Sequence, residues 1–233
     1  HARREIASVL NCLPEEIYFT SGGTESDNWA IMGAAFAGFR KGNHIITTKI
    51  EHPAVKNICR YLEHFGFDIT WMDVDRNGFV KPEEIEKAVR KDTILISVMT
   101  ANNEIGTIQP VYEIGKIAKH HKVIFHTDAV QAFCHIPIDV EQIQADLLSG
   151  SSHKFGGPKG MGFLYIRKGT EINSYMHGGH QERGMRAGTG NVPGAVGMGK
   201  AAAAAWKNMD NIIRYETMLR NYMIKRILAE IPR

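Results

Sequence analysis

The feature of this sequence that most constrains its fold is a regular alternation of short apolar runs with helix-like segments. Runs typical of β-strands cover residues 17–20, 44–50, 67–74, 93–100, 123–128, 145–148 and 162–166. Helix-like patterns cover residues 28–39, 53–62, 82–90 and 111–121. Strands that alternate with helices favour right-handed crossovers and a mostly parallel sheet with helices on both faces. We therefore predict an α/β fold, in which the chemistry lies beyond the carboxyl ends of the strands.

The composition excludes several classes of protein. The 233 residues are 43% hydrophobic and 23% charged, as in an ordinary globular domain. Lys and Arg number 28 against 25 for Asp and Glu, and a net charge of +3 is too balanced to indicate nucleic acid or an anionic membrane as a partner. No stretch reaches the roughly 20 apolar residues that a membrane span needs. Three cysteines without a Cys-X-X-Cys pair argue against disulfides and structural zinc, so we expect a soluble, cytoplasmic protein.

Both ends of the chain indicate a piece of a longer protein. Residues 1–10 are typical of the middle or end of an amphipathic helix, with no capping residue in front of them. Residues 215–231 have apolar residues at helical spacing, but the chain stops before anything that could pack on that face. We therefore expect that sequence is missing on both sides.

The first candidate site is a glycine-rich turn between a strand and a helix, residues 20–28 (TSGGTESDN). Gly23 would let the backbone approach a ligand, the free amides of the helix start favour a phosphate, and Thr24 adds a hydroxyl donor. A tight turn that caps the helix explains the same residues equally well. The spacing matches neither a Walker loop nor the Gly-X-Gly-X-X-Gly motif.

An acid and a lysine follow two later strands. Asp128 ends an apolar run, where a carboxylate needs a cation or donors, and the protonated pyridine nitrogen of pyridoxal phosphate is one such partner. A helix cap is the competing explanation for Asp128. Lys154 lies beside His153 in a glycine-rich segment, which suits Schiff-base chemistry, whereas a lone lysine is normally a solvated surface charge.

Three more segments carry polar side chains that could face a ligand. His52 follows a strand and could lie over an aromatic cofactor and move protons, and Asn103 follows the central apolar strand. Residues 177–189 form a glycine-rich loop whose Arg, His and Thr side chains could contact an anion. A structural histidine, an Asn-rich turn and a surface loop are the alternatives. His177 and His180 lack further ligands at the right spacing, so we expect no metal site.

Taken in order, six segments resemble the motifs of a cysteine desulfurase. They are residues 22–28 (GGTESDN), 51–52 (EH), 102–106 (NNEIG), 128–131 (DAVQ), 151–154 (SSHK) and 182–189 (ERGMRAGT). The resemblance implies the class V, fold-type I group of pyridoxal-phosphate enzymes, in the branch that supplies sulfur for iron–sulfur clusters. It also implies two domains. Residues 1–209 would form the cofactor-binding large domain without its N-terminal part, and residues 210–233 would begin a smaller C-terminal domain.

The resemblance assigns roles around the cofactor ring. Lys154 would bind pyridoxal phosphate covalently and, once freed by substrate, move protons at the substrate's α carbon. Asp128 would pair with the pyridinium nitrogen, and His52 would stack on the ring. Gln131 would hydrogen-bond the phenolic oxygen, with Asn103 close to that oxygen and to the substrate carboxylate.

The resemblance also assigns the phosphate contacts. The residues implied to hold the phosphate within one chain are Gly23, Thr24, Ser151 and His153. Thr189 resembles the residue that reaches across a dimer to the partner's phosphate. A homodimer with shared sites is therefore implied.

The implied reaction converts L-cysteine to L-alanine and passes the sulfur to an enzyme persulfide. The persulfide would then supply an iron–sulfur scaffold or another thiol acceptor. The nucleophilic cysteine and the arginine that holds the substrate carboxylate are expected after the 182–189 motif, outside this chain. Cys12, Cys59 and Cys134 do not match the nucleophile and are expected to be structural. The isolated chain is therefore not expected to form a persulfide.

Two alternatives remain open. One keeps the fold and cofactor but changes the reaction to that of a selenocysteine lyase, a β-lyase or an aminotransferase. The other is a non-catalytic, truncated homologue that retains the fold. Direct nucleic-acid binding is disfavoured, because the basic residues are scattered and no aromatic stripe accompanies them.

Overall fold

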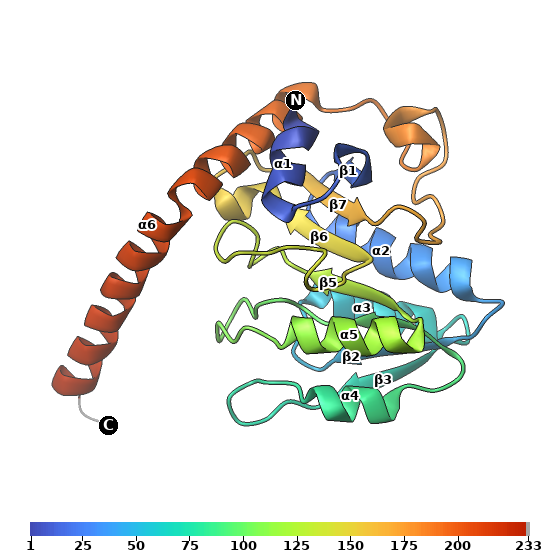
Figure 1. Ribbon diagram of the computed structural model, residues 1–233, viewed down its shortest axis with the longest axis horizontal. Helices are drawn as coiled ribbons and strands as arrows, with labels where there is room; N and C mark the ends of the chain where they lie inside the picture. Colours follow the sequence, from blue (N-terminus) through green and yellow to red (C-terminus); the bar gives the residue numbers. More distant parts are fainter. Residues whose placement is uncertain (232–233) are drawn as a thin grey trace.

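The computed structural model describes residues 1–231, and its centre is one mixed β-sheet (Figure 1). The strands in the order in which they pair are β1 (Ile17–Thr20), β7 (Gly162–Ile166), β6 (Leu147–Ser151), β5 (Ile124–Asp128), β4 (Thr93–Ser97), β2 (His44–Thr48) and β3 (Asp68–Met72). Strands β3, β2, β4, β5 and β6 are parallel, whereas β7 is antiparallel to both β6 and β1. The predicted mostly parallel α/β sheet is confirmed.

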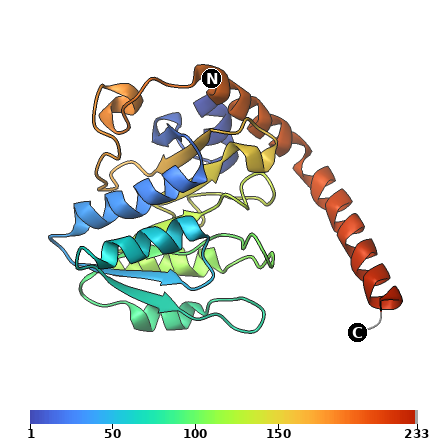
Figure 2. The ribbon, with the colours of Figure 1, turned by 180° about the vertical axis from the view of Figure 1, so that it is seen from behind.

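Helices cover both faces of this sheet. Helices α2 (Gly23–Gly38) and α3 (Pro53–Glu63) lie on the face that is in front in Figure 2. The other face carries α1 (Ala2–Leu10), α4 (Pro82–Ala88), α5 (Val111–His121) and the first part of α6 (Val192–Glu230). Short 3₁₀ helices lie at Pro14–Glu16, Ser152–Phe155 and Gln181–Gly184. Each face therefore has its own hydrophobic core, one around Trp29 and one around Phe125.

The central strands form because they are buried on both sides. Every residue of β2, β4, β6 and β7 is buried, which explains why these runs lack polar alternation. The expected ranges 111–121 and 162–166 match α5 and β7, and the other strands end within a few residues of their expected limits. The sheet thus fixes where the connections at its carboxyl edge begin.

Helix α2 begins at Gly23, five residues before the expected start at residue 28. Its first turn is polar, so an apolar pattern does not reveal it. Two of its polar residues are nevertheless buried: the Ser26 hydroxyl donates to the Phe163 carbonyl at 2.9 Å, and Asp27 is 1% exposed. The helix start is therefore set by contacts with β7 that lie far away in sequence.

Helix α6 continues without a break across the expected domain boundary at residues 209 and 210. Met209 is its last buried residue, and large apolar side chains beyond it are exposed. The division into 1–209 and 210–233 stays a prediction. No helix within residues 1–231, α6 included, is both long and apolar enough to cross a membrane.

Candidate active site

A cavity of about 260 Å³ opens at the carboxyl edge of the parallel strands. Nine of the ten residues predicted to hold the cofactor line it: Gly23, Thr24, His52, Asn103, Asp128, Gln131, Ser151, His153 and Lys154. Asp27, Met99, Ala101 and Val130 complete the lining. The connections after β2, β4, β5 and β6 and the first turn of α2 meet here, as expected for a parallel sheet.

Asp128 is the last residue of β5 and is only 5% exposed. Its Oδ1 atom accepts a hydrogen bond from the Val130 backbone N–H at 2.9 Å. Burial raises the pKa of Asp128, while the Val130 N–H and the nearby His52 and Lys154 side chains oppose that rise. A cation bound in the cavity beside this carboxyl would offset its desolvation and favour the carboxylate.

Lys154 lies in the 3₁₀ helix Ser152–Phe155, which directly follows β6. Phe155 anchors this turn in the core by packing against Phe133, with ring centroids 5.0 Å apart. The Lys154 backbone carbonyl lies 2.9 Å from Nε2 of His135, while its side chain lines the cavity. The turn that carries Lys154 is thus fixed in the core, and the Lys154 side chain lines the cavity.

His52 is the N-cap of α3. Its Nδ1 atom accepts a hydrogen bond from the Ala54 backbone N–H at 3.1 Å, and Pro53 occupies the first helical position. Because Nδ1 is an acceptor, the proton of the neutral ring is on Nε2. The cap therefore fixes both the tautomer and the orientation of a ring that lines the cavity.

Glu51, beside His52, is a buried acid that sequence reasoning did not single out as a separate residue. Its Oε1 atom accepts from the Thr48 hydroxyl at 2.7 Å and from the Met99 N–H at 3.0 Å. Its Oε2 atom has no hydrogen-bond partner among residues 1–231, and burial raises the pKa of Glu51 to about 8. The side chain ties the loop after β2 to the end of β4.

Replacing Glu51 with glutamine is expected to flatten the pH dependence of stability. The folded protein holds a proton on Glu51 up to about pH 8, whereas the unfolded chain releases it near its ordinary pKa of 4.5. Stability contributed by this group is therefore present at low pH and is lost as pH rises through that window, by up to about 1.4 kcal/mol per pH unit. Urea unfolding from about pH 5 to about pH 8 measures the slope. Glu171→Gln, at an exposed position, is the matched control, and an unchanged slope in Glu51→Gln would contradict a protonated Glu51.

The lining of the cavity fits pyridoxal phosphate. A side chain at Gly23 would bring its Cβ within 2.6 Å of Val130 Cγ2, so the bare helix start leaves room for a phosphate. Gln131 Oε1 and Asp27 Oδ1 are buried without a hydrogen-bond partner. These unpaired polar atoms, the Asp128 carboxyl and the Lys154 amine match a polar aromatic ligand that carries an aldehyde and an anionic group.

Asp27 lies within the candidate turn 20–28 but was not chosen as a site residue, because the helix was expected to begin only at residue 28. Its Oδ1 atom lies 3.7 Å from Nε2 of the buried His126, whose pKa is lowered to about 3 by burial. Burial and the nearby Asp128 carboxyl raise the pKa of Asp27 well above its ordinary value. Its position one helical turn after Thr24 is the signal that could have placed it on the same face of α2.

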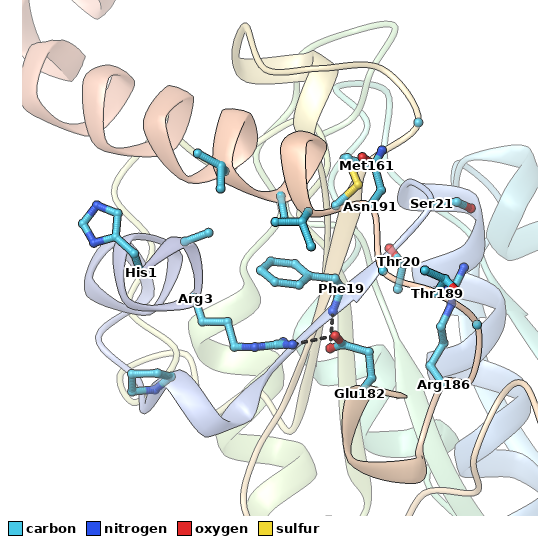
Figure 3. A pocket seen from close by; sticks show the side chains of 18 of the residues that line it. His1, Arg3, Phe19, Thr20, Ser21, Met161, Glu182, Arg186, Thr189 and Asn191 are labelled. Atoms are coloured by element: carbon cyan, nitrogen blue, oxygen red, sulfur yellow. Dashed lines mark hydrogen bonds and ion pairs between the residues drawn. The ribbon is translucent and has the colours of Figure 1, made fainter. Parts of the chain in front are cut away.

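Thr189 does not line this cavity. It lies in a second cavity of about 570 Å³, together with Thr20, Ser21 and Arg186 (Figure 3). Thr20 and Ser21 of the segment that joins β1 to α2 line the second cavity, whereas Gly23 and Thr24 line the first. The structure thus separates Thr189 from the nine other predicted residues of its own chain.

The three cysteines are free and lie away from both cavities. Burial raises the pKa of Cys12 and Cys134 to about 12 and that of Cys59 further still. Such thiols are poor nucleophiles near neutral pH, because they stay protonated. In the described residues no three His, Cys, Asp or Glu side chains are arranged to hold a metal ion.

Comparison with known proteins agrees with the cavity. The chain is 57% identical to the cysteine desulfurase IscS of Dictyoglomus turgidum over 99% of its length, and 56% identical to that of Methanosarcina thermophila over its whole length. It spans 58% and 57% of these two relatives. A solved NifS-like protein superposes with a TM-score of 0.95 at 44% identity, over 98% of this chain and 63% of the other.

The family model for class-V aminotransferases matches residues 1–232. This family depends on pyridoxal phosphate, so the predicted cofactor is confirmed at the level of the family. The resemblance to cysteine desulfurases is confirmed as well. The chain belongs to the class-V aminotransferase family, among relatives that are cysteine desulfurases.

Proposed function

We propose that the protein is a pyridoxal-phosphate-dependent cysteine desulfurase, which converts L-cysteine to L-alanine and passes the sulfur to an enzyme persulfide. The observation that carries the proposal is that nine residues from four separate connections and one helix start line a single cavity. The names of the relatives support the choice of reaction. Because the chain spans less than two thirds of their length, the proposal concerns the whole protein.

In this proposal each side chain at the cavity has one task. Lys154 attaches the cofactor and, when released, moves a proton at the α carbon of the substrate. Asp128 supplies a negative charge at the ring nitrogen, and His52 supports one face of the ring. The pyridine ring of the bound cofactor stores the electrons that the broken C–H bond leaves behind.

The phosphate group would lie at the start of α2. Gly23 and Thr24 offer the amides and hydroxyl of a helix N-terminus, where an anion is favoured. Ser151 Oγ and His153 Nδ1, which also line the cavity, lie 3.1 Å apart, so each restrains the other. Gln131 and Asn103, whose amide nitrogens can donate, remain for the phenolic oxygen and the substrate carboxylate.

The thiol that receives the sulfur is proposed to lie outside this chain. Cys12, Cys59 and Cys134 do not line the cavity, and burial keeps their thiols protonated near neutral pH. We further propose a homodimer in which Thr189 serves the partner's site. The sulfur would pass on to an iron–sulfur scaffold or another thiol acceptor, and free cysteines fit a cytoplasmic location.

Product analysis tests the proposal. The naturally expressed protein, loaded with pyridoxal phosphate and given L-cysteine and a reducing thiol, is expected to release equal amounts of alanine and sulfide. Pyruvate with ammonia would indicate a β-lyase, whereas a keto acid formed with transfer of the amino group would indicate an aminotransferase. A preference for selenocysteine would indicate a selenocysteine lyase. No product from any of these substrates would identify a non-catalytic homologue.

A further inference from the structure

The loop from β7 to α6 contains a short segment of strained backbone. Glu182 and Arg183 have φ angles of 44° and 58°, in the left-handed region that residues with a side chain rarely adopt. Such backbone persists only where the surroundings fix it, and it gathers at functional sites. Contacts between this loop and the rest of the fold must therefore offset the cost of that backbone.

The two strained residues are held by their own side chains to β1 and α1. Glu182 accepts from Arg3 Nη2 at 2.5 Å and from the Phe19 backbone N–H at 2.9 Å (Figure 3). Arg183 donates to the Ile17 carbonyl at 3.0 Å, and its guanidinium lies 3.8 Å from the centre of the Tyr18 ring. These contacts fix Glu182 and Arg183 against the rest of the fold.

A second attachment joins Arg186, further along the same loop, to α2. Arg186 donates from Nε to Glu25 Oε1 at 2.7 Å and from Nη2 to Glu25 Oε2 at 3.0 Å. The side chains are only 18% and 9% exposed, so solvent screens this ion pair weakly. Glu25 also accepts from the Ser21 N–H at 2.9 Å and hydroxyl at 2.5 Å. The pair thus locks the loop to the turn that begins α2.

This attachment joins two segments that line different cavities. Glu25 directly follows Gly23 and Thr24, which line the cavity of the proposed cofactor site. Arg186 precedes Thr189 by three residues, and both line the second cavity. A two-pronged guanidinium–carboxylate pair fixes orientation as well as distance. Its geometry therefore sets where Thr189 lies relative to the phosphate-facing turn.

We propose that Glu25 and Arg186 are positioning residues that hold Thr189 ready to contact the cofactor phosphate of a second copy of this chain. The inference rests on the proposed function, since it requires both the cofactor and the homodimer. It explains why Thr189 is kept out of its own cofactor cavity by a strained and doubly anchored loop. The ion pair would lie in one subunit and would affect cofactor binding in the other subunit.

The first test measures the affinity of the protein for pyridoxal phosphate by absorbance titration. Arg186→Gln is expected to weaken binding roughly ten- to hundredfold, the range for losing one hydrogen bond to a charged group. Glu25→Gln should weaken it to a similar degree, and the double variant should be little worse than either single one. Lys41→Gln, which breaks an exposed ion pair at the far end of α2, is the matched control.

The decisive test mixes subunits. A heterodimer combines an Arg186→Gln subunit with a Lys154→Ala subunit, so that covalent cofactor can form only at Lys154 of the first subunit. That site receives an intact loop from the second subunit, and its affinity should return to the wild-type value. Thr189→Val in place of Arg186→Gln should behave in the same way, and it leaves the ion pair untouched.

The outcomes separate the two proposals. Three results would each overturn the positioning role. The first is weak cofactor binding that persists at Lys154 of the Arg186→Gln subunit in the heterodimer. The others are losses of affinity that simply add in the double variant, and an affinity that does not change in the single variants. A wild-type protein that binds no pyridoxal phosphate, or binds it as a monomer, would instead overturn the proposed function. Thermal unfolding of each cofactor-free variant shows whether a loss of affinity reflects a loss of fold. If the ion-pair variants do not fold, Thr189→Val, which keeps the ion pair, tests whether Thr189 serves the cofactor site of the other subunit.

Discussion

Replacing Lys154 with alanine is expected to abolish the visible absorption band of bound pyridoxal phosphate and all turnover of L-cysteine. The amine of Lys154 lies at the cavity beside His52 and Asp128, and no other lysine lines that cavity. Without it the aldehyde has no covalent partner, and no amine remains to move the α proton. Absorbance spectra of the dialysed variant, recorded beside the wild-type protein, measure the loss.

Lys159→Ala is the matched control for this experiment. Lys159 lies in the same glycine-rich segment, but it is exposed and does not line the cavity. Its replacement should leave both the band and the activity unchanged. A visible band of wild-type intensity in Lys154→Ala would remove Lys154 from the proposed chemistry.

Replacing Asp128 with alanine is expected to leave pyridoxal phosphate bound but to slow removal of the α proton by roughly 10²- to 10³-fold, as for loss of one preorganised electrostatic contact. The carboxyl is fixed by the Val130 N–H and lies at the cavity, where a positive ring nitrogen would be stabilised by it. Without that charge the ring attracts electrons less strongly. Exchange of the α hydrogen with deuterated water, followed by NMR, measures this step directly.

Asp128→Asn separates charge from shape. The amide keeps the size of the side chain and an acceptor for the Val130 N–H, but it cannot carry the negative charge. We expect its exchange rate to fall nearly as far as that of the alanine variant. A rate close to wild type in either variant would show that Asp128 does not support the ring nitrogen.

The sheet and most of the site could be predicted because their signals are local. A strand buried on both faces is a continuous apolar run, as in residues 93–97, and its carboxyl end is where polar residues gather. Asp128 and Lys154 stand at such ends, and the order of six short motifs supplied the family. The place of each of these side chains at the end of its strand could therefore be predicted from the sequence.

The contacts that join distant segments could not be predicted in the same way. Glu25 and Arg186 are 161 residues apart, and each is an ordinary charged residue in its own surroundings. The antiparallel pairing of β1 with β7 likewise depends on which strands become neighbours. Asp27 could be placed in the lining only once α2 was seen to begin at Gly23 and to bury the Asp27 side chain. These features follow from tertiary packing, which no short window of sequence contains.

The measurement that tests the central claim most directly is mass spectrometry of the naturally expressed protein, with and without borohydride reduction, followed by mapping of the modified peptide. Reduction makes a lysine-bound pyridoxal group permanent. We predict an adduct on the peptide that contains Lys154 after reduction, and no adduct in the untreated sample. No adduct at all, or one on a lysine outside the cavity, would contradict the proposed active site.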